Sequence, residues 1–255
     1  MSKKELLSKI GLRQDGRRAD ELRRIRCKLG VFSQPDGSAY LEQGLTKVLA
    51  TVYGPHQVRG SRSKAQHDMA IINCQFSMAV FSTGERKKRP RGDRKSTEIS
   101  IHLQQALMAT VKAELYPWSQ IDVYVEVLHA DGGILPACIN AATLALIDAG
   151  IPLKEYICAC TASLANSNIA MIDISNYEEI IGGPVLTVAA LPMSGKIILL
   201  EMSKRFHLDH LPKVLNVAVQ GCKDIKVILD EAVKHHVEDV GSSIGWSSTA
   251  QKLHT

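Results

Sequence analysis

Apolar and polar residues alternate along much of the first third of the chain. At residues 70–80 the even positions are apolar and the odd positions include three polar residues. A period of two is typical of a strand with one buried face. The β-branched run at residues 46–53 predicts a second strand that ends before Gly54-Pro55, and apolar arms around a Pro-Asp-Gly turn predict a hairpin over residues 31–41.

A helical period replaces this alternation at residues 99–111. Apolar side chains recur there at spacings of three and four, which places them on one face of a helix. Ser96 or Thr97 is the expected N-cap. Glu98 falls in the first turn, and Pro117 marks the stop.

A glycine turn joins the next strand to the next helix. Residues 121–127 alternate as a strand and lead to Asp131-Gly132-Gly133. Pro136 suits the first turn of the following helix and Gly150 suits its end. The turn is therefore expected at the N-terminus of this second helix.

The second half of the chain repeats the theme of strands followed by a helix. Apolar strands are expected at residues 156–164, 169–174, 185–191 and 197–202, and a long amphipathic helix at 209–240. Residues 241–255 are rich in Gly and Ser and are predicted to be disordered.

The order of these elements predicts the fold class. Strands, then helix, strand and helix, then strands and a helix favour an α+β fold, or an α/β fold of two halves sharing one core. We expect a single domain over residues 1–240, with halves at about 8–152 and 153–240, followed by a tail at 241–255.

Composition supports a packed protein. The 255 residues are 45% hydrophobic and 22% charged, which is ordinary for a protein with a sizeable core. No apolar run approaches the ~20 residues that a membrane span requires, so no membrane role is expected. The six cysteines form no Cys-x-x-Cys pair, which favours a reducing, intracellular site.

The charge is polarised along the chain. Residues 1–95 carry 21 basic and 9 acidic side chains, although the net charge of the whole chain is only +5. The densest basic segment, residues 84–95, has seven cations and two acids, and such clusters bind nucleic acid by releasing counterions. The alternative is a solvated charged loop. Further candidate cations are Arg13, Arg17, Arg18, Arg23, Arg24, Arg26, Arg59, Arg62 and Lys64.

The glycine turn is a second candidate site, because amides at a helix N-terminus can cradle a phosphate. Ile134 and Leu135 follow it, however, where an anion site would want a hydroxyl and a guanidinium. Pro136 also removes one amide donor. A tight turn is the better interpretation of this motif.

Three carboxylates form a third candidate. Asp173, Glu178 and Glu179 are spaced so that they could hold a metal ion or supply a proton. The simpler interpretation is three acids in a loop. The histidines form no ligand pattern, so no metal and no cofactor are expected.

Five ordered motifs lie along the chain. They are GLRQDGRR at 11–18, DGSAYLEQG at 36–44, FSTGER at 81–86, DGG at 131–133 and NAATLALIDAGIP at 140–152. Together these motifs resemble the RNase PH family and, within it, the ring subunits of the eukaryotic RNA exosome. The resemblance covers residues of about 8 to 240.

The resemblance implies an RNase PH fold of two βαβα-type halves and a six-membered ring of heterodimers through which single-stranded RNA threads. Implied partners are other RNase PH-like subunits, cap RNA-binding subunits and a hydrolytic exoribonuclease. The implied locations are the nucleus and nucleolus, and also the cytoplasm. Active relatives cleave RNA 3′ ends with inorganic phosphate and release nucleoside diphosphates.

Carried over residue by residue, the resemblance exposes departures at the active site. Arg94-Lys95 stands where active members tend to show Arg-Arg, so one bidentate fork is missing. Gly133 matches, but Ile134 replaces Ser or Thr and Leu135 replaces Arg. The acid position falls on Glu179, with Asp173 retained upstream.

These departures predict that the chain is not an enzyme but a non-catalytic ring subunit. Losing one transition-state donor typically lowers a rate by ~10² to 10³. Asp173, Glu179, Gly133, Ile134 and Leu135 would then be vestigial. The chain would guide RNA 3′ ends to a separate nuclease, and the alternative is an active phosphate-dependent 3′ to 5′ exoribonuclease. The expected RNA-binding residues are Arg59, Arg62, Lys64, Arg86, Arg94 and Lys95.

Overall fold

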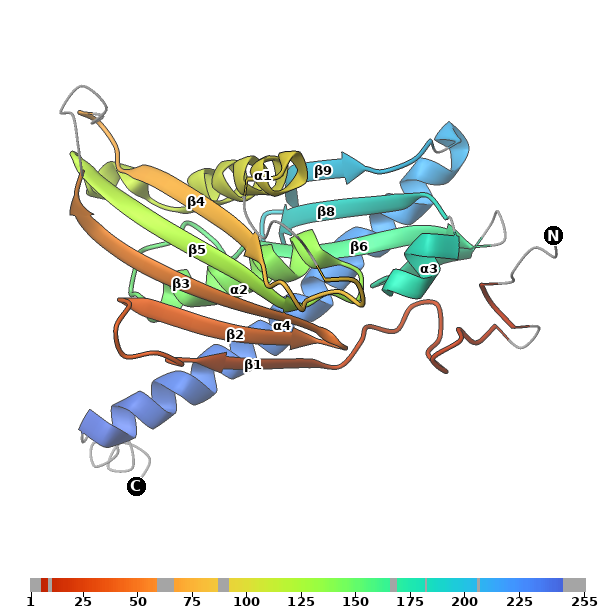
Figure 1. Ribbon diagram of the computed structural model, residues 1–255, viewed down its shortest axis with the longest axis horizontal. Helices are drawn as coiled ribbons and strands as arrows, with labels where there is room; N and C mark the ends of the chain where they lie inside the picture. The colour runs from red at the N-terminus through yellow and green to blue at the C-terminus, as the bar shows by residue number, and fades with distance from the viewer. Residues whose placement is uncertain are drawn as a thin grey trace.

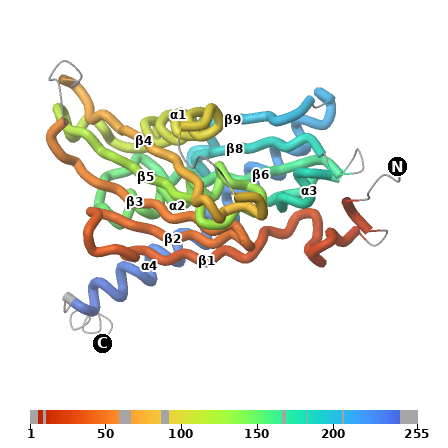
Figure 2. Tube along the Cα trace, in the orientation of Figure 1, coloured from red at the N-terminus to blue at the C-terminus, as the bar shows by residue number. Residues whose placement is uncertain are grey.

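The computed structural model describes residues 6–8, 11–58, 67–86, 92–165, 169–181, 183–205 and 207–244. Two β-sheets and three of the helices make up its body, as Figures 1 and 2 show. Each half of the chain contributes one sheet. The contacts between the two halves determine which side chains are brought together at their junction.

The first half forms a five-stranded sheet in the order β1-β2-β3-β5-β4. Its strands are β1 (Ile25–Leu29), β2 (Gly37–Gln43), β3 (Thr46–Gln57), β4 (Ile71–Met78) and β5 (Ser119–His129). The pairs are antiparallel except for β4 and β5, which are parallel. Parallel neighbours need a crossover, and a helix supplies it.

Helix α1 (Arg94–Thr110) is this crossover, and α2 (Ile134–Asp148) follows β5. Helix α1 packs on β4 and also contacts β9 (Lys196–Met202) of the second sheet. Helix α2 contacts β2 and β3 of the first sheet and β6 (Cys158–Ala165) of the second, and twelve of its residues are buried. An apolar helix buried almost all round belongs in the centre of a core.

The second half forms a four-stranded antiparallel sheet in the order β7-β6-β8-β9. Its strands are β6 (Cys158–Ala165), β7 (Ile169–Ile172), β8 (Val185–Leu191) and β9 (Lys196–Met202). The short helix α3 (Asn176–Ile181) lies between β7 and β8.

The long helix α4 (Leu211–Ile244) packs along β6, β7 and β8 and runs on to β1 (Figure 1). Two 3-10 turns, η2 (Ala113–Leu115) and η3 (Leu208–His210), complete the elements. Among the described residues, no helix is both long and apolar enough to cross a membrane.

One hydrophobic cluster contains buried residues of both sheets and of α1, α2 and α4. Val125, Leu144, Cys160 and Ile225 are all fully buried members from different elements. The predicted fold class, with two halves that share a core, is confirmed. The first half does end in a βαβα unit, β4-α1-β5-α2.

Several predicted boundaries are wrong. The hairpin forms between β1 and β2, so residues 31–36 are its connection rather than a strand. Strand β3 continues past Gly54-Pro55, whose peptide bond is cis, and α1 begins at Arg94 with Asp93 as its N-cap. Helix α3 replaces a predicted loop. Residues 241–244, predicted to open a disordered tail, are helical, whereas 245–255 lie outside the described residues.

Candidate functional site

The turn between β5 and α2 depends on two glycines. Gly132 has φ +78° and Gly133 has φ +60°, in the left-handed region that favours glycine. A Cβ on Gly132 would lie 2.6 Å from the backbone of Ile174, Ser175 and Asn176, because the start of α3 packs directly against the turn. The preferred interpretation as a tight turn agrees with this geometry, and Gly133 is also the N-cap of α2.

The side chain of Arg23 holds this turn in place through hydrogen bonds. Its guanidinium donates a 2.6 Å hydrogen bond to the Asp131 carbonyl and a 3.3 Å bond to the Gly132 carbonyl. The Thr46 hydroxyl also donates to the Gly132 carbonyl, at 2.8 Å. Arg23 is only 6% exposed. The side chain therefore positions the start of α2 from inside the protein.

Asp173 is the buried partner of Arg23. Its carboxylate lies 2.8 Å from the guanidinium and also accepts hydrogen bonds from the Arg23 amide and from Gln43. Burial raises the pKa of the Asp173 carboxyl, but the charge and hydrogen bonds of Arg23 outweigh this, so the pKa lies below its usual value. A fully buried, paired carboxylate has no proton to give, so Asp173 holds the structure together.

The three predicted carboxylates are separated by the fold. Glu178 is 5% exposed and pairs with Arg13 at 3.4 Å. Glu179, on the next position of α3, is exposed and faces a cavity. Among the described residues, no group of three or more potential ligand side chains could hold a metal ion. The structure therefore does not bring Asp173, Glu178 and Glu179 together as one group of ligands.

Glu179 lines a cavity of about 260 Å³ where the two halves meet. Most of the cavity's lining residues come from α1, the start of α2, β8, β9 and α3. The lining residues are Lys95, Glu98, Ile99, His102, Gly133, Ile134, Leu135, Pro136, Thr161, Ile174, Glu179, Val185, Thr187, Glu201 and Ser203. The structure thus brings four predicted site positions, Gly133, Ile134, Leu135 and Glu179, together with Lys95.

The cavity also contains charged residues that the sequence did not single out for this site. His102 Nδ1 lies 3.8 Å from a carboxylate oxygen of Glu201 on β9. Lys95, Glu98 and His102 occupy positions three and four apart on α1 and therefore share one face. That spacing was visible in the sequence, whereas Glu201 is brought close only by the packing of α1 beside β9.

The predicted RNA-binding residues fall into two groups. Arg86, Arg94 and Lys95 are exposed. Arg94 and Lys95 begin α1, where basic side chains oppose the helix dipole, so the fold does not need them there. Arg59, Arg62 and Lys64 lie outside the described residues.

Two other candidate cations, Arg13 and Arg23, cannot bind nucleic acid. Both are buried, and each is committed to an acidic partner, Glu178 and Asp173 respectively. For these two side chains the prediction of a nucleic-acid contact is wrong, because no local pattern indicates their acidic partners in the second half.

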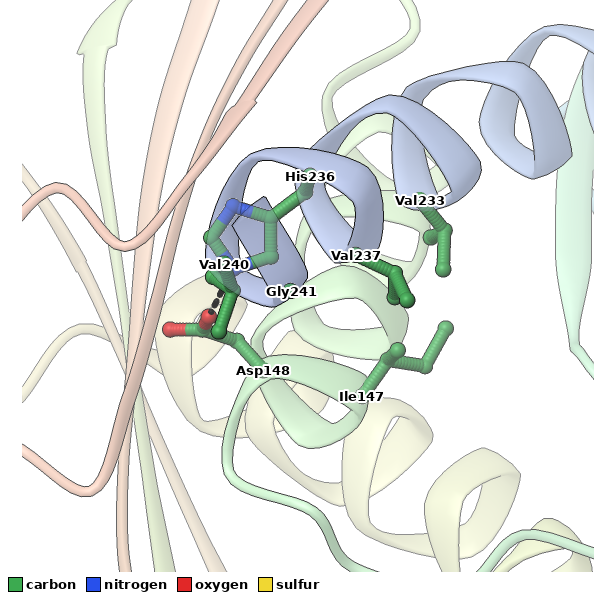
Figure 3. A pocket seen from close by; sticks show the side chains of 7 residues that line it. All are labelled: Ile147, Asp148, Val233, His236, Val237, Val240 and Gly241. Atoms are coloured by element: carbon green, nitrogen blue, oxygen red, sulfur yellow. Dashed lines mark ion pairs between the residues drawn. The ribbon is translucent and has the colours of Figure 1, made fainter. Parts of the chain in front are cut away.

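A second cavity, of about 250 Å³, lies between the ends of α2 and α4 (Figure 3). His236 Nε2 is 3.0 Å from Asp148 Oδ1 there, and the Ser38 amide donates to the other oxygen of Asp148. The rest of the lining, Ile147, Val233, Val237, Val240 and Gly241, is apolar. We assign this cavity to the packing of α4.

Two family models match the chain. The 3′ exoribonuclease family, domain 1, matches residues 21–152, and domain 2 of the same family matches residues 155–221. The matched segments correspond to the two sheets with their helices. The cavity lies between them.

The chain is also similar to curated proteins over nearly all its length. It is 55% identical over 241 residues to exosome complex component RRP41 of Homo sapiens, covering 94% of this chain and 98% of that protein. It is 37% identical over 242 residues to exosome complex component Rrp41 of Thermoplasma acidophilum, covering 94% and 96%.

A solved structure shows the same fold. It is an Archaeoglobus fulgidus exosome with RNA bound to the active site, matched with a TM-score of 0.73 at 19% identity over 85% of this chain and 92% of that one. At this identity the likeness concerns the fold alone.

The prediction that the chain is not an enzyme is wrong. The matching models describe 3′ exoribonucleases along both halves, and the relatives include an archaeal Rrp41 as well as the human protein. The prediction relied on the departures at Lys95, Ile134, Leu135 and Glu179, and chiefly on Ile134 and Leu135. The cavity they line also contains a cation and a carboxylate, Lys95 from α1 and Glu179 from α3.

Proposed function

Because the chain belongs to the 3′ exoribonuclease (RNase PH) family, we propose that it is a ring subunit of an RNA exosome that acts in RNA processing and decay. Its relatives from human and from Thermoplasma acidophilum are exosome complex components. The ring would contain other RNase PH-like subunits, and single-stranded RNA would pass along it.

One observation carries the proposal. Lys95, at the start of α1, and Glu179, on α3, line one cavity at the junction of the two matched domains. The exposed Arg94 and Lys95 supply positive charge beside it, and each phosphate that they neutralise releases counterions. The cavity is where we place the 3′-terminal nucleotide.

The proposal also specifies the type of subunit, its partners and its cellular location. From the five motifs we propose the ring-subunit type known as exosome component 4. We also propose cap RNA-binding subunits on the ring and a hydrolytic exoribonuclease that receives the threaded RNA. Nuclear, nucleolar and cytoplasmic locations complete the proposal.

Phosphorolysis within the cavity is the second candidate function, favoured by the presence of both Lys95 and Glu179 in its lining. An oxygen of inorganic phosphate would attack the last phosphodiester, and the bond from that phosphorus to the 3′ oxygen of the preceding nucleotide would break. Glu179 would give its proton to this oxygen, and a nucleoside diphosphate would leave. Lys95 and the free amides of α2 would hold the attacking phosphate.

Co-expression with an RNase PH-like partner subunit tests the proposed function. The complex should elute as a six-membered ring with equal amounts of the two chains, and a radiolabelled RNA 3′ end should cross-link to it. A chain that stays monomeric with every RNase PH-like partner would overturn the proposal.

A further inference from the structure

Trp118 adopts a backbone conformation that its side chain does not favour. Its φ is +61°, and apart from glycines only one other described residue, Asp173, has a positive φ. For a bulky residue this conformation is strained, and such strain persists where the surroundings or a function require it. Asp173 has such a reason in its buried contacts. Trp118, by contrast, is 47% exposed.

His67 holds the indole in place. The two ring centroids are 4.0 Å apart and the ring planes are 77° to each other, an edge-to-face contact. His67 is itself exposed. The pair therefore buries little surface for the core, and a large part of the indole remains accessible.

The pair lies at one end of the five-stranded sheet. Ser119, the first residue of β5, pairs with Gln57 at the end of β3, and Gln120 pairs with Ile71 at the start of β4. The other end of β5 leads to the glycine turn, where Gly133 lines the cavity. Eleven residues of β5 separate the two places by roughly 35 Å.

The segment that precedes His67 in the sequence is basic, although Asp68 follows His67 directly. Between Val58 and His67 the chain carries Arg59, Arg62 and Lys64 and no acidic residue. These residues lie outside the described part of the chain, and we do not include them in the site. Their charge in the sequence favours a polyanion, rather than a neutral protein surface, as the partner of this part of the chain.

We propose that Trp118, positioned by His67, stacks on a base of single-stranded RNA at the end of the sheet remote from the cavity. Every base has a π-face, so an exposed indole binds single strands with little sequence preference. The inference rests on the proposed function only in taking RNA as the ligand. It adds a contact to bases, whereas Arg94 and Lys95 provide contacts to phosphates.

A pair of substitutions at Trp118 tests the proposal. Trp118→Gly removes the ring at a position whose φ suits glycine, so the variant should fold; Trp118→Phe keeps an aromatic ring. Both are made in the full chain carrying Trp246→Phe, since the chain has 2 tryptophans and Trp118 is then the only tryptophan of the parent, whose emission is excited selectively over that of tyrosine. Binding is measured with oligoadenylate and with an abasic oligomer of the same length and charge.

Oligoadenylate should quench Trp118 fluorescence, and Trp118→Gly should weaken oligoadenylate binding about 5- to 150-fold, the range for 1 to 3 kcal/mol per stacked base. Trp118→Phe should lose much less affinity for oligoadenylate, because it keeps an aromatic ring. Binding of the abasic oligomer, and the salt dependence of both, should be unchanged because no charge is altered.

Equal binding by Trp118→Gly and its parent, or equal loss for the abasic oligomer, would overturn the stacking proposal. If Trp118→Gly lost a protein contact in the assembled ring but still bound RNA normally, the stacking proposal would be overturned, and Trp118 would instead bind a protein partner. Its failure is distinct from failure of the proposed function. Ring assembly without quenching contradicts only the stacking, and quenching without ring assembly contradicts only the exosome assignment.

Discussion

Arg23 and Asp173 form a buried ion pair, 2.8 Å between Nη2 and Oδ1, that joins the two halves of the chain. Arg23 precedes β1 of the first sheet, and Asp173 follows β7 of the second. The same guanidinium holds the carbonyls of Asp131 and Gly132 at the start of α2. The ion pair that joins the two halves therefore also positions the glycine turn, whose Gly133 lines the cavity.

Replacing Asp173 should cost far more stability than replacing the nearby Glu179. Asp173→Asn leaves the Arg23 charge buried without its partner, and breaking such a pair typically costs about 3 to 5 kcal/mol. Glu179→Gln changes an exposed side chain and should alter the free energy of unfolding by less than about 0.5 kcal/mol. Urea unfolding of both variants measures this difference, and similar values for the two would contradict the structural role of Asp173.

Asp173 should also make stability depend on acid. Since its folded-state pKa is lowered, its contribution is fully present above the unfolded value of about 3.9 and is lost as pH falls through the folded value. The wild-type chain should therefore lose stability in this acidic window, and Asp173→Asn should show a flatter profile there. Thermal unfolding at a series of pH values tests the prediction, and parallel profiles would refute it.

Gly132 should not tolerate a side chain. In Gly132→Ala the new Cβ would meet backbone atoms at 2.6 Å in an already left-handed conformation. The expected cost is about 2 to 6 kcal/mol from strain and overpacking together. Gly150→Ala is the matched control, because Gly150 has φ +68° but nothing within 4 Å of a Cβ. Its cost should be about 1 to 2 kcal/mol, and a cost equal to that of Gly132→Ala would argue against the close packing of α3 on the turn.

Phosphorolysis should depend on Glu179. With partner subunit, RNA, Mg²⁺ and phosphate, the parent complex should release nucleoside diphosphates. Glu179→Gln should lower the rate by about 10² to 10⁴, the usual contribution of a positioned acid. Ring assembly should be unchanged, because the residue is exposed on α3. Release of diphosphates at an undiminished rate would exclude Glu179 as the acid.

Charge reversal at the start of α1 should affect stability and RNA binding in opposite directions. Acidic side chains are favoured at a helix N-terminus, so Arg94→Glu and Lys95→Glu should each stabilise the chain by about 0.3 to 1 kcal/mol. RNA binding should nevertheless weaken, and its salt dependence should become shallower. A parallel loss of stability and RNA binding would show that these residues serve the fold.

Periodicity predicted the elements that have strongly patterned sequences. β4, β5, α1 and α2 follow from alternation, helical spacing and glycine or proline signals. The short helix α3 was missed because six residues are too few to show a helical period. Asp93 was overlooked as an N-cap because Ser96 and Thr97, which bond back to it, are equally good capping residues.

The site was only partly predictable, because packing between distant parts of the sequence decides which charged residues are buried in pairs and which line the cavity. Nothing local distinguishes Glu178 from Glu179, yet the first pairs with buried Arg13 and the second faces the cavity. Arg23 looks like any other basic residue of the first segment until Asp173, 150 positions later, is placed beside it. The glycine turn, by contrast, was predicted correctly because φ > 0 is a local requirement.

The most direct test of the proposed function is RNA protection by the assembled ring at low salt. A ring containing the parent chain should protect the 3′ segment of a bound RNA from a soluble nuclease. A ring containing Arg94→Glu and Lys95→Glu together should assemble equally well but protect that segment much less. Unchanged protection by the double variant would contradict the placing of RNA beside α1 and its cavity.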